Sequence, residues 1–177
     1  MCTLETERLL LRPVCQDDLD DLFALRSDPQ VLQFLGQGKP WTREETAEKL
    51  RRVARHWHEH GFGMWAMLDR ADGRFVGWCG IGYWHGLPDI ELGYTVAPRC
   101  WGRGLATEAV GCLLRYAFEV LGLPRVVGVA RVGNVASQKV MLKAGMSLRQ
   151  PYPFDGHEGL LYAVENPRGT PPDSGAG

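Results

Sequence analysis

The chain has 177 residues, 45% of them hydrophobic and 23% charged, which is an ordinary composition for one globular domain. Twenty basic and twenty-one acidic residues leave a formal net charge of −1, which excludes a general nucleic-acid or membrane-surface binder. The five cysteines have no paired spacing, which favours free thiols over a disulfide framework or a zinc site. The first residues lack an apolar signal core and no apolar run reaches the roughly 20 residues that span a bilayer, so we expect a cytoplasmic protein.

The apolar spacing along the chain predicts alternating strands and helices. Thr42 and Glu45 form a capping box at the start of one helix, and Gly61 is the glycine expected after its end. Asp28 followed by Pro29 predicts the start of a shorter helix. We expect strands at 8–13, 63–68, 75–84, 90–96, 125–132, 146–150 and 159–164, and helices at 16–26, 28–35, 42–60, 105–121 and 134–144. This order predicts a mixed α/β fold with a strongly twisted sheet and helices on both faces.

The most informative segment is a strand at 91–96 that runs into the glycine turn Arg99-Cys-Trp-Gly-Arg-Gly104 and then a helix. A helix N-terminus carries unpaired N–H groups and a partial positive charge, which suits a pyrophosphate. Gly102 and Gly104 allow the backbone to approach a ligand because they have no Cβ. A P-loop is excluded because leucine and alanine follow Gly104 where lysine and serine or threonine are needed. A Rossmann domain would place its glycine turn in the first strand–helix unit.

Two further motifs accompany this turn, Glu7-Arg-Leu-Leu-Leu-Arg-Pro13 and Asn134-x-x-Ser137, the latter ending in Lys143-Ala-Gly-Met146. With these three motifs in this order, the chain resembles the GNAT superfamily of acetyl-CoA-dependent N-acetyltransferases. Within it, the chain is most similar to the RimJ/RimL branch, which includes ribosomal-protein N-terminal acetyltransferases. The resemblance spans roughly residues 5–165. It implies a GNAT-like fold: a mixed, mostly antiparallel sheet of about seven strands whose central strands splay at the cofactor cleft.

The resemblance also implies acetyl-CoA as co-substrate and no metal cofactor. The pantetheine arm would lie along the strand that ends at Val96, and the backbone N–H groups of the glycine turn would hold the pyrophosphate. Arg99 and Arg103 would supply positive charge nearby. Asn134 has two interpretations, a helix N-cap and a cofactor contact. The residues expected to bind the cofactor are Val96, Arg99, Trp101, Gly102, Arg103, Gly104, Leu105, Ala106 and Asn134.

Direct acetyl transfer to an amine needs a neutral amine, stabilisation of an oxyanion and a proton for the leaving thiolate. Glu91 is the candidate base, acting through water, with Trp84 and Tyr94 expected as an apolar wall that raises its pKa. Many members of the superfamily carry a tyrosine seven residues after the motif asparagine, where this chain has Met141, which donates no proton. Ser137 is expected to take that place as partner of the thiolate. Glu91 also fits an ion pair, and Ser137 also fits a bond to its own helix backbone.

The acceptor is expected to be a primary amine, either a protein N-terminal α-amine or the amine of a small molecule. Trp41 and Trp84, which lie beside glycine and proline loops, are the candidates for lining the acceptor pocket, although both also fit the core. His56 and His60 share a helix face, and a solvated histidine face is favoured there over a metal site. Because Met141 replaces the tyrosine, an acyl-CoA-binding regulatory or sensor module without efficient turnover stays open as an alternative.

The domain organisation follows from composition. We expect one acetyltransferase domain over residues 1–166 and a disordered tail over 167–177, where no large apolar residue is present to anchor the chain. Nothing in the sequence predicts a nucleic-acid or membrane partner. Exposed strand edges near the C-terminus are compatible with a homodimer.

Overall fold

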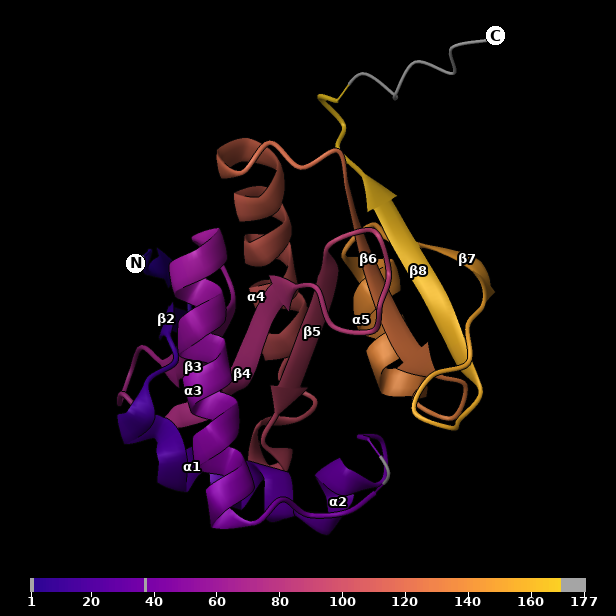
Figure 1. The fold of residues 1–177 in the computed structure, drawn as a ribbon. Helices are drawn as coiled ribbons and strands as arrows, with labels where there is room; N and C mark the ends of the chain where they lie inside the picture. Colours follow the sequence, from indigo (N-terminus) through magenta and orange to yellow (C-terminus); the bar gives the residue numbers. More distant parts are fainter. Residues whose placement is uncertain (1, 37, 170–177) are drawn as a thin grey trace, which may run out of the picture.

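A computed structural model describes residues 2–36 and 38–169 (Figure 1). The described residues form a single eight-stranded sheet in the order β1-β2-β3-β4-β5-β6-β8-β7. The strands are β1 (Leu4–Glu5), β2 (Leu9–Pro13), β3 (Met64–Asp69), β4 (Phe75–Gly82), β5 (Glu91–Val96), β6 (Arg125–Arg131), β7 (Ser147–Pro151) and β8 (Gly159–Glu165). The α-helices are α1 (Leu19–Ser27), α2 (Pro29–Leu32), α3 (Arg43–His60), α4 (Leu105–Arg115) and α5 (Val135–Lys143).

The sheet is antiparallel at every junction except the one between β5 and β6. In the described chain this parallel pairing covers only Glu91 and Leu92 of β5, which face Val127 and Gly128. Strand β5 continues to Val96, so the two central strands separate beyond Leu92. The mixed, mostly antiparallel sheet with splayed central strands confirms the predicted fold class.

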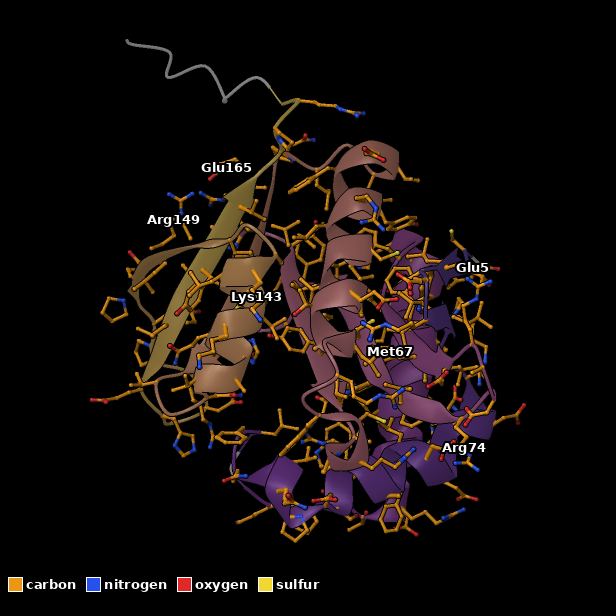
Figure 2. All side chains as sticks on the ribbon, turned by 180° about the vertical axis from the view of Figure 1, so that it is seen from behind. Glu5, Met67, Arg74, Lys143, Arg149 and Glu165 are labelled. Atoms are coloured by element: carbon orange, nitrogen blue, oxygen red, sulfur yellow. The ribbon has the colours of Figure 1, made fainter. Side chains whose placement is uncertain are left out.

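Helices cover both faces of the sheet. Figure 1 looks onto the face covered by α1 and α3, whereas α4 and α5 lie on the opposite face, which Figure 2 shows from behind. The predicted capping box begins α3, where the Thr42 N–H donates to Glu45 at 2.7 Å and the Glu45 N–H donates to Thr42 at 3.1 Å. Gly61 ends this helix with a φ of +76°, a left-handed conformation that glycine adopts without strain.

Several elements differ in their bounds from those expected from the sequence, and one strand is additional. Helix α2 ends at Leu32, and after its C-cap Gln33 the N–H groups of Phe34 and Leu35 donate three positions back, as in tight turns. The predicted helix at 105–121 is α-helical to Arg115 and then forms a π-helical segment, Tyr116–Val120. The strand β1 was not predicted, since two residues carry no periodic pattern.

The C-terminal part of the described chain is held at the end of α4. The Asn166 side chain donates to the Leu123 carbonyl at 3.0 Å, and its oxygen accepts from the Arg168 N–H at 2.9 Å. Residues 167–169 form a turn there, and the rest of the predicted tail, 170–177, lies outside the described residues. Among the described helices, none combines the length and apolar character needed to cross a membrane.

Candidate functional site

The separation of β5 from β6 opens into a cavity of about 430 Å³ that α4 and α5 border. Figure 2 looks onto this side, with Lys143 of α5 labelled beside α4. The apolar end of the cavity is formed by Val31, Phe34 and Leu35, in and after α2. Of the residues expected to bind cofactor or thiolate, the structure places these in the lining: Val96, Trp101, Gly102, Gly104, Leu105, Ala106, Asn134 and Ser137.

The glycine turn presents an uninterrupted row of backbone N–H groups. The Trp101 N–H donates to Pro98 at 3.0 Å, and the Glu108 N–H donates to Gly104 at 3.1 Å. Between them, the N–H groups of residues 102–107 have no acceptor in the part of the chain that the structure describes. Gly104 has a φ of +77° and stands directly before α4, so the row leads into the helix N-terminus. This arrangement suits an anionic ligand such as a pyrophosphate.

The freed edge of β5 adds backbone groups to the cavity. The Val127 N–H donates to the Ile90 carbonyl at 3.0 Å, so even-numbered residues of β5 direct their N–H and C=O groups toward β6. Because the pairing ends at Leu92, the peptide groups of Tyr94 have no strand partner among the residues that the structure describes. The next carbonyl on this side, that of Val96, accepts a hydrogen bond from the Trp101 indole at 2.7 Å. The Tyr94 peptide is therefore the part of this edge that a ligand can use.

Two hydroxyl groups meet at the wall of the cavity. The Tyr94 hydroxyl lies 2.7 Å from the Ser137 hydroxyl and donates to the Ser137 carbonyl at 3.0 Å. Burial raises the pKa of Tyr94 to about 12, against the opposing effect of its hydrogen bond with Ser137. The expectation that Tyr94 lies beside Glu91 was wrong, because residues three apart on a strand point to opposite faces. Met141 is fully buried, with its sulfur against Gly128.

The structure shows one of the two roles expected of Asn134, that of a helix N-cap. Its side-chain oxygen accepts from the Ser137 N–H at 3.1 Å and so caps α5. Asn134 also lines the cavity, so capping and ligand contact are compatible.

The cationic residues near the cavity differ from those the motif suggested. The Arg99 guanidinium donates to the Phe75 carbonyl, and that of Arg103 lies 3.4 Å from the Asp69 carboxylate. Neither arginine lines the cavity. Instead, Lys139 and Lys143 of α5 line it. These two lysines stand four residues apart, a spacing that puts them on one helix face, and this was the signal in the sequence that could have identified them.

Glu91 lies on the opposite face of β5 and is paired with His85. The Glu91 residue is 3% exposed, and both of its carboxylate oxygens lie 2.8 Å from His85 Nδ1. The hydrogen bond to Glu91 raises the pKa of His85 above its ordinary value. The other ring nitrogen, Nε2, lies 4.0 Å from Asp155, and Tyr152 donates to the His85 carbonyl at 3.1 Å. The β7–β8 loop thus borders a half-buried histidine whose Nδ1 is bound by Glu91 and whose Nε2 faces Asp155 of that loop.

The two tryptophans expected in the acceptor pocket have different surroundings. The Trp84 ring lies across two glycines, and a Cβ on Gly82 or Gly93 would come within 2.8 Å of it. Because Gly82 pairs with Glu91, Trp84 lies on the same face as that carboxylate. Trp41 instead packs edge-on against Trp78 at 6.3 Å, with the Arg26 guanidinium 4.0 Å above its ring.

His85 is the main functional candidate that sequence reasoning missed. It stands six residues before Glu91 in an irregular loop, so no periodicity or motif connects the two. The conformation of that loop, together with the contacts from Tyr152 and Phe154, brings the ring onto the carboxylate.

Comparison with known proteins agrees with this geometry. Residues 8–147 match the family described as Acetyltransferase (GNAT) domain. An FsC-acetyl coenzyme A-N(2)-transacetylase of Aspergillus fumigatus is 32% identical over 164 residues, covering 82% of this chain, which spans only 65% of that protein. An acetyltransferase from Agrobacterium tumefaciens is 30% identical with a TM-score of 0.81, over 93% of this chain and 95% of its own. A RimL ribosomal L7/L12 α-N-protein acetyltransferase in complex with coenzyme A has a TM-score of 0.79 over 93% of this chain and 98% of its own. Its sequence is only 18% identical, so this similarity shows a shared fold and no more. The chain belongs to the GNAT family of N-acetyltransferases, as its motifs predicted.

Proposed function

We propose that this enzyme binds acetyl-CoA in the cavity between the splayed strands and transfers the acetyl group directly to a primary amine. The single observation that carries the proposal is the row of unpartnered N–H groups at 102–107, which opens onto the same cavity as the freed edge of β5. The N–H groups of the turn can bind an anion, and the freed strand edge can bind an extended chain of amide groups.

The residues present fit such a ligand. The N–H groups of the glycine turn would hold the pyrophosphate, and the unpaired Tyr94 peptide would bind the pantetheine arm. Lys139 and Lys143 would add positive charge in the cavity. Arg99 and Arg103 lie outside its lining and are bound to other groups of the protein.

The acceptor amine would approach from the face of Glu91 and His85. Acetyl-CoA supplies a thioester: a C–N bond to the amine forms, the C–S bond breaks, and CoA leaves as the thiolate, which takes a proton from solvent to become the thiol. With His85 Nδ1–H donating to Glu91, neutral His85 has a free lone pair on Nε2 to take the amine proton. Glu91 then acts as the positioning residue that orients the ring and stabilises its charged form. The raised pKa of His85 suits a base that works near neutral pH.

The Ser137 and Tyr94 hydroxyls take part on the opposite side of the strand. Tyr94, with a pKa of about 12, does not release its proton near neutral pH. When Tyr94 donates its single proton to the Ser137 hydroxyl oxygen in place of the Ser137 carbonyl, the Ser137 proton is free to point into the cavity and to bind a thiolate. The pair thereby occupies the role for which Met141 is unsuitable.

The Ser137→Ala variant is expected to lower kcat about tenfold, because a hydrogen bond to a charged group contributes about 1.5–3 kcal/mol. The KM for acetyl-CoA is expected to change little, since the amides at 102–107 are intact. Tyr94→Phe is expected to have a smaller effect, because Ser137 keeps its hydroxyl. Steady-state kinetics of the two variants provide the check, and wild-type turnover in Ser137→Ala would remove the serine from the mechanism.

The acceptor class is tested by thiol release from acetyl-CoA over a panel of amines. The panel contains peptides that begin with serine, alanine or threonine, together with amino acids, polyamines and aminoglycosides. Release with peptides alone would identify an N-terminal acetyltransferase, and release with a small amine would identify a small-molecule enzyme. Binding of acetyl-CoA without release for any amine would contradict the proposal and favour the acyl-CoA-binding sensor module.

A further inference from the structure

A second cavity lies on the acceptor side of the sheet, between α3 and the end of β4. Its volume is about 240 Å³, enough for a small polar group but not for a whole cofactor. Lys49, Arg52, Arg55 and His56 of α3 line it, and Trp84 closes it on the side of the sheet. Since Trp84 also lies over Gly82 and Gly93, the cavity and the Glu91–His85 pair adjoin the same indole ring.

The charge in this cavity is not neutralised by the described residues. Arg55 is 3.4 Å from Glu48, but Lys49 and Arg52 have no acidic partner within the described ranges. The one acidic residue in the lining, Glu59, lies 4.0 Å from His60. Burial lowers the pKa of Lys49, and repulsion from Arg52 and Arg26 lowers it further.

Two polar groups nearby lack a hydrogen-bond partner in the described structure. His56 lines the cavity, and its Nε2 is buried with no partner. Arg26 is only 7% exposed, its Nε has no acceptor among the described residues, and burial lowers its pKa to about 10. Arg26 does not line the cavity and Arg52 is exposed, but Lys49 is half-buried and is repelled by both, so an anion in the cavity would stabilise its charged form.

We propose that this cavity binds an anionic group, a carboxylate or a phosphate, on the amine that the enzyme acetylates. Lys49 and Arg52 would bind the oxyanion and His56 would donate to it, while the amine lies at His85 on the other side of Trp84. The inference rests on the proposed function, and it narrows the acceptor to amines that carry an anionic group, such as amino acids, phosphorylated amines or peptides with an acidic residue near the N-terminus.

The test measures binding of matched probes to the CoA-loaded protein by isothermal titration calorimetry. One pair is phosphoethanolamine and ethanolamine, a second is serine and serinamide, and a third is Ser-Asp and Ser-Asn dipeptide amides. The anionic member of at least one pair is expected to bind about tenfold more tightly than its neutral partner, and the pair that responds identifies the source of the anion.

Variants then assign the effect to the cavity. Arg52→Gln and Lys49→Gln are expected to reduce binding of the anionic probe to the level of the neutral one. Arg51→Gln is the matched control, because Arg51 has the same charge on the same helix but lies outside the cavity and 2.9 Å from Glu48. An equal loss in all three variants, equal binding within every pair, or no binding of any anionic probe would overturn the inference.

Thiol release separates this inference from the proposed function. Turnover of anionic amines with an unchanged KM in Arg52→Gln would leave the acetyltransferase proposal standing and remove the anion site. Selective binding of anionic amines with no thiol release would leave the anion site standing and contradict the transfer step.

Discussion

The His85→Ala variant is expected to lose about a hundredfold or more in kcat/KM for the acceptor, while its affinity for CoA stays that of the wild type. The reason is that general base catalysis contributes about 10²–10⁴-fold, and in the proposed mechanism Nε2 takes the amine proton because Nδ1 is bound by Glu91. Initial rates measured at several acceptor concentrations provide the kinetic part, and calorimetry with CoA provides the affinity. His58→Ala is the matched control, because His58 is an exposed histidine on α3 outside both cavities.

The Glu91→Gln variant extends this test to the pH profile. Glu91 and Asp155 raise the pKa of His85, whereas burial and Lys49 lower it, and the hydrogen bond that His85 donates to Glu91 is the largest of these effects. Activity requires neutral His85, so the rate falls as the pH drops below its pKa. Removing the charge of Glu91 lowers that pKa, and the acid limb of the profile is expected to move to lower pH with a reduced maximum. An acid limb that stays in place, or a His85→Ala variant with wild-type activity, would contradict the assignment.

The second large effect is expected from Gly104→Val, which should weaken CoA binding by about a hundredfold or more, because several amide hydrogen bonds are lost together. Gly104 has a φ of +77°, and a β-branched residue is strained there by roughly 1–2 kcal/mol. A Cβ at this position would point toward Arg8, at 3.6 Å, and would therefore act on the backbone rather than block the cavity directly. The turn is expected to change conformation and to move the N–H groups of 105–107 out of line.

Gly122→Val provides the control for backbone strain. Gly122 has a φ of +65° with open space around it, and it lies beyond the far end of α4 from the cavity. Both variants are expected to lower the melting temperature, but only Gly104→Val should lose CoA affinity in calorimetry. Wild-type affinity in Gly104→Val would remove the glycine turn from the cofactor site.

Features that depend on local sequence were predictable. The capping box at Thr42 and Glu45, the cap at Asp28 and the glycine turn before α4 are each specified by residues within one turn of one another. The residues of that turn and the start of α5 were also predictable from local motifs, and the structure places them around one cavity. The motifs therefore predicted most of the glycine-turn and α5 residues that line this cavity, and their binding of a cofactor stays a prediction.

The acceptor side was not predictable, because it depends on contacts between distant segments. His85 comes onto Glu91 through an irregular loop that Tyr152 and Phe154 hold in place. The hydrogen bond from Arg99 to the Phe75 carbonyl likewise depends on the contact between the start of β4 and the glycine turn. By contrast, the separation of Tyr94 from Glu91 follows from strand alternation, and applying the two-residue period to β5 would have predicted it.

The most direct test of the central claim, direct transfer between two bound substrates, uses isotope-labelled acetyl-CoA and mass spectrometry of the protein and the acceptor. The account predicts that the label appears on the acceptor amine only when protein, acetyl-CoA and acceptor are present together. It also predicts that the protein incubated with acetyl-CoA alone stays unlabelled, including at Cys100, which lies in the glycine turn and lines the cavity. A labelled protein that passes its acetyl group to an acceptor added later would contradict direct transfer, and an unlabelled acceptor across the whole panel would contradict the proposed function.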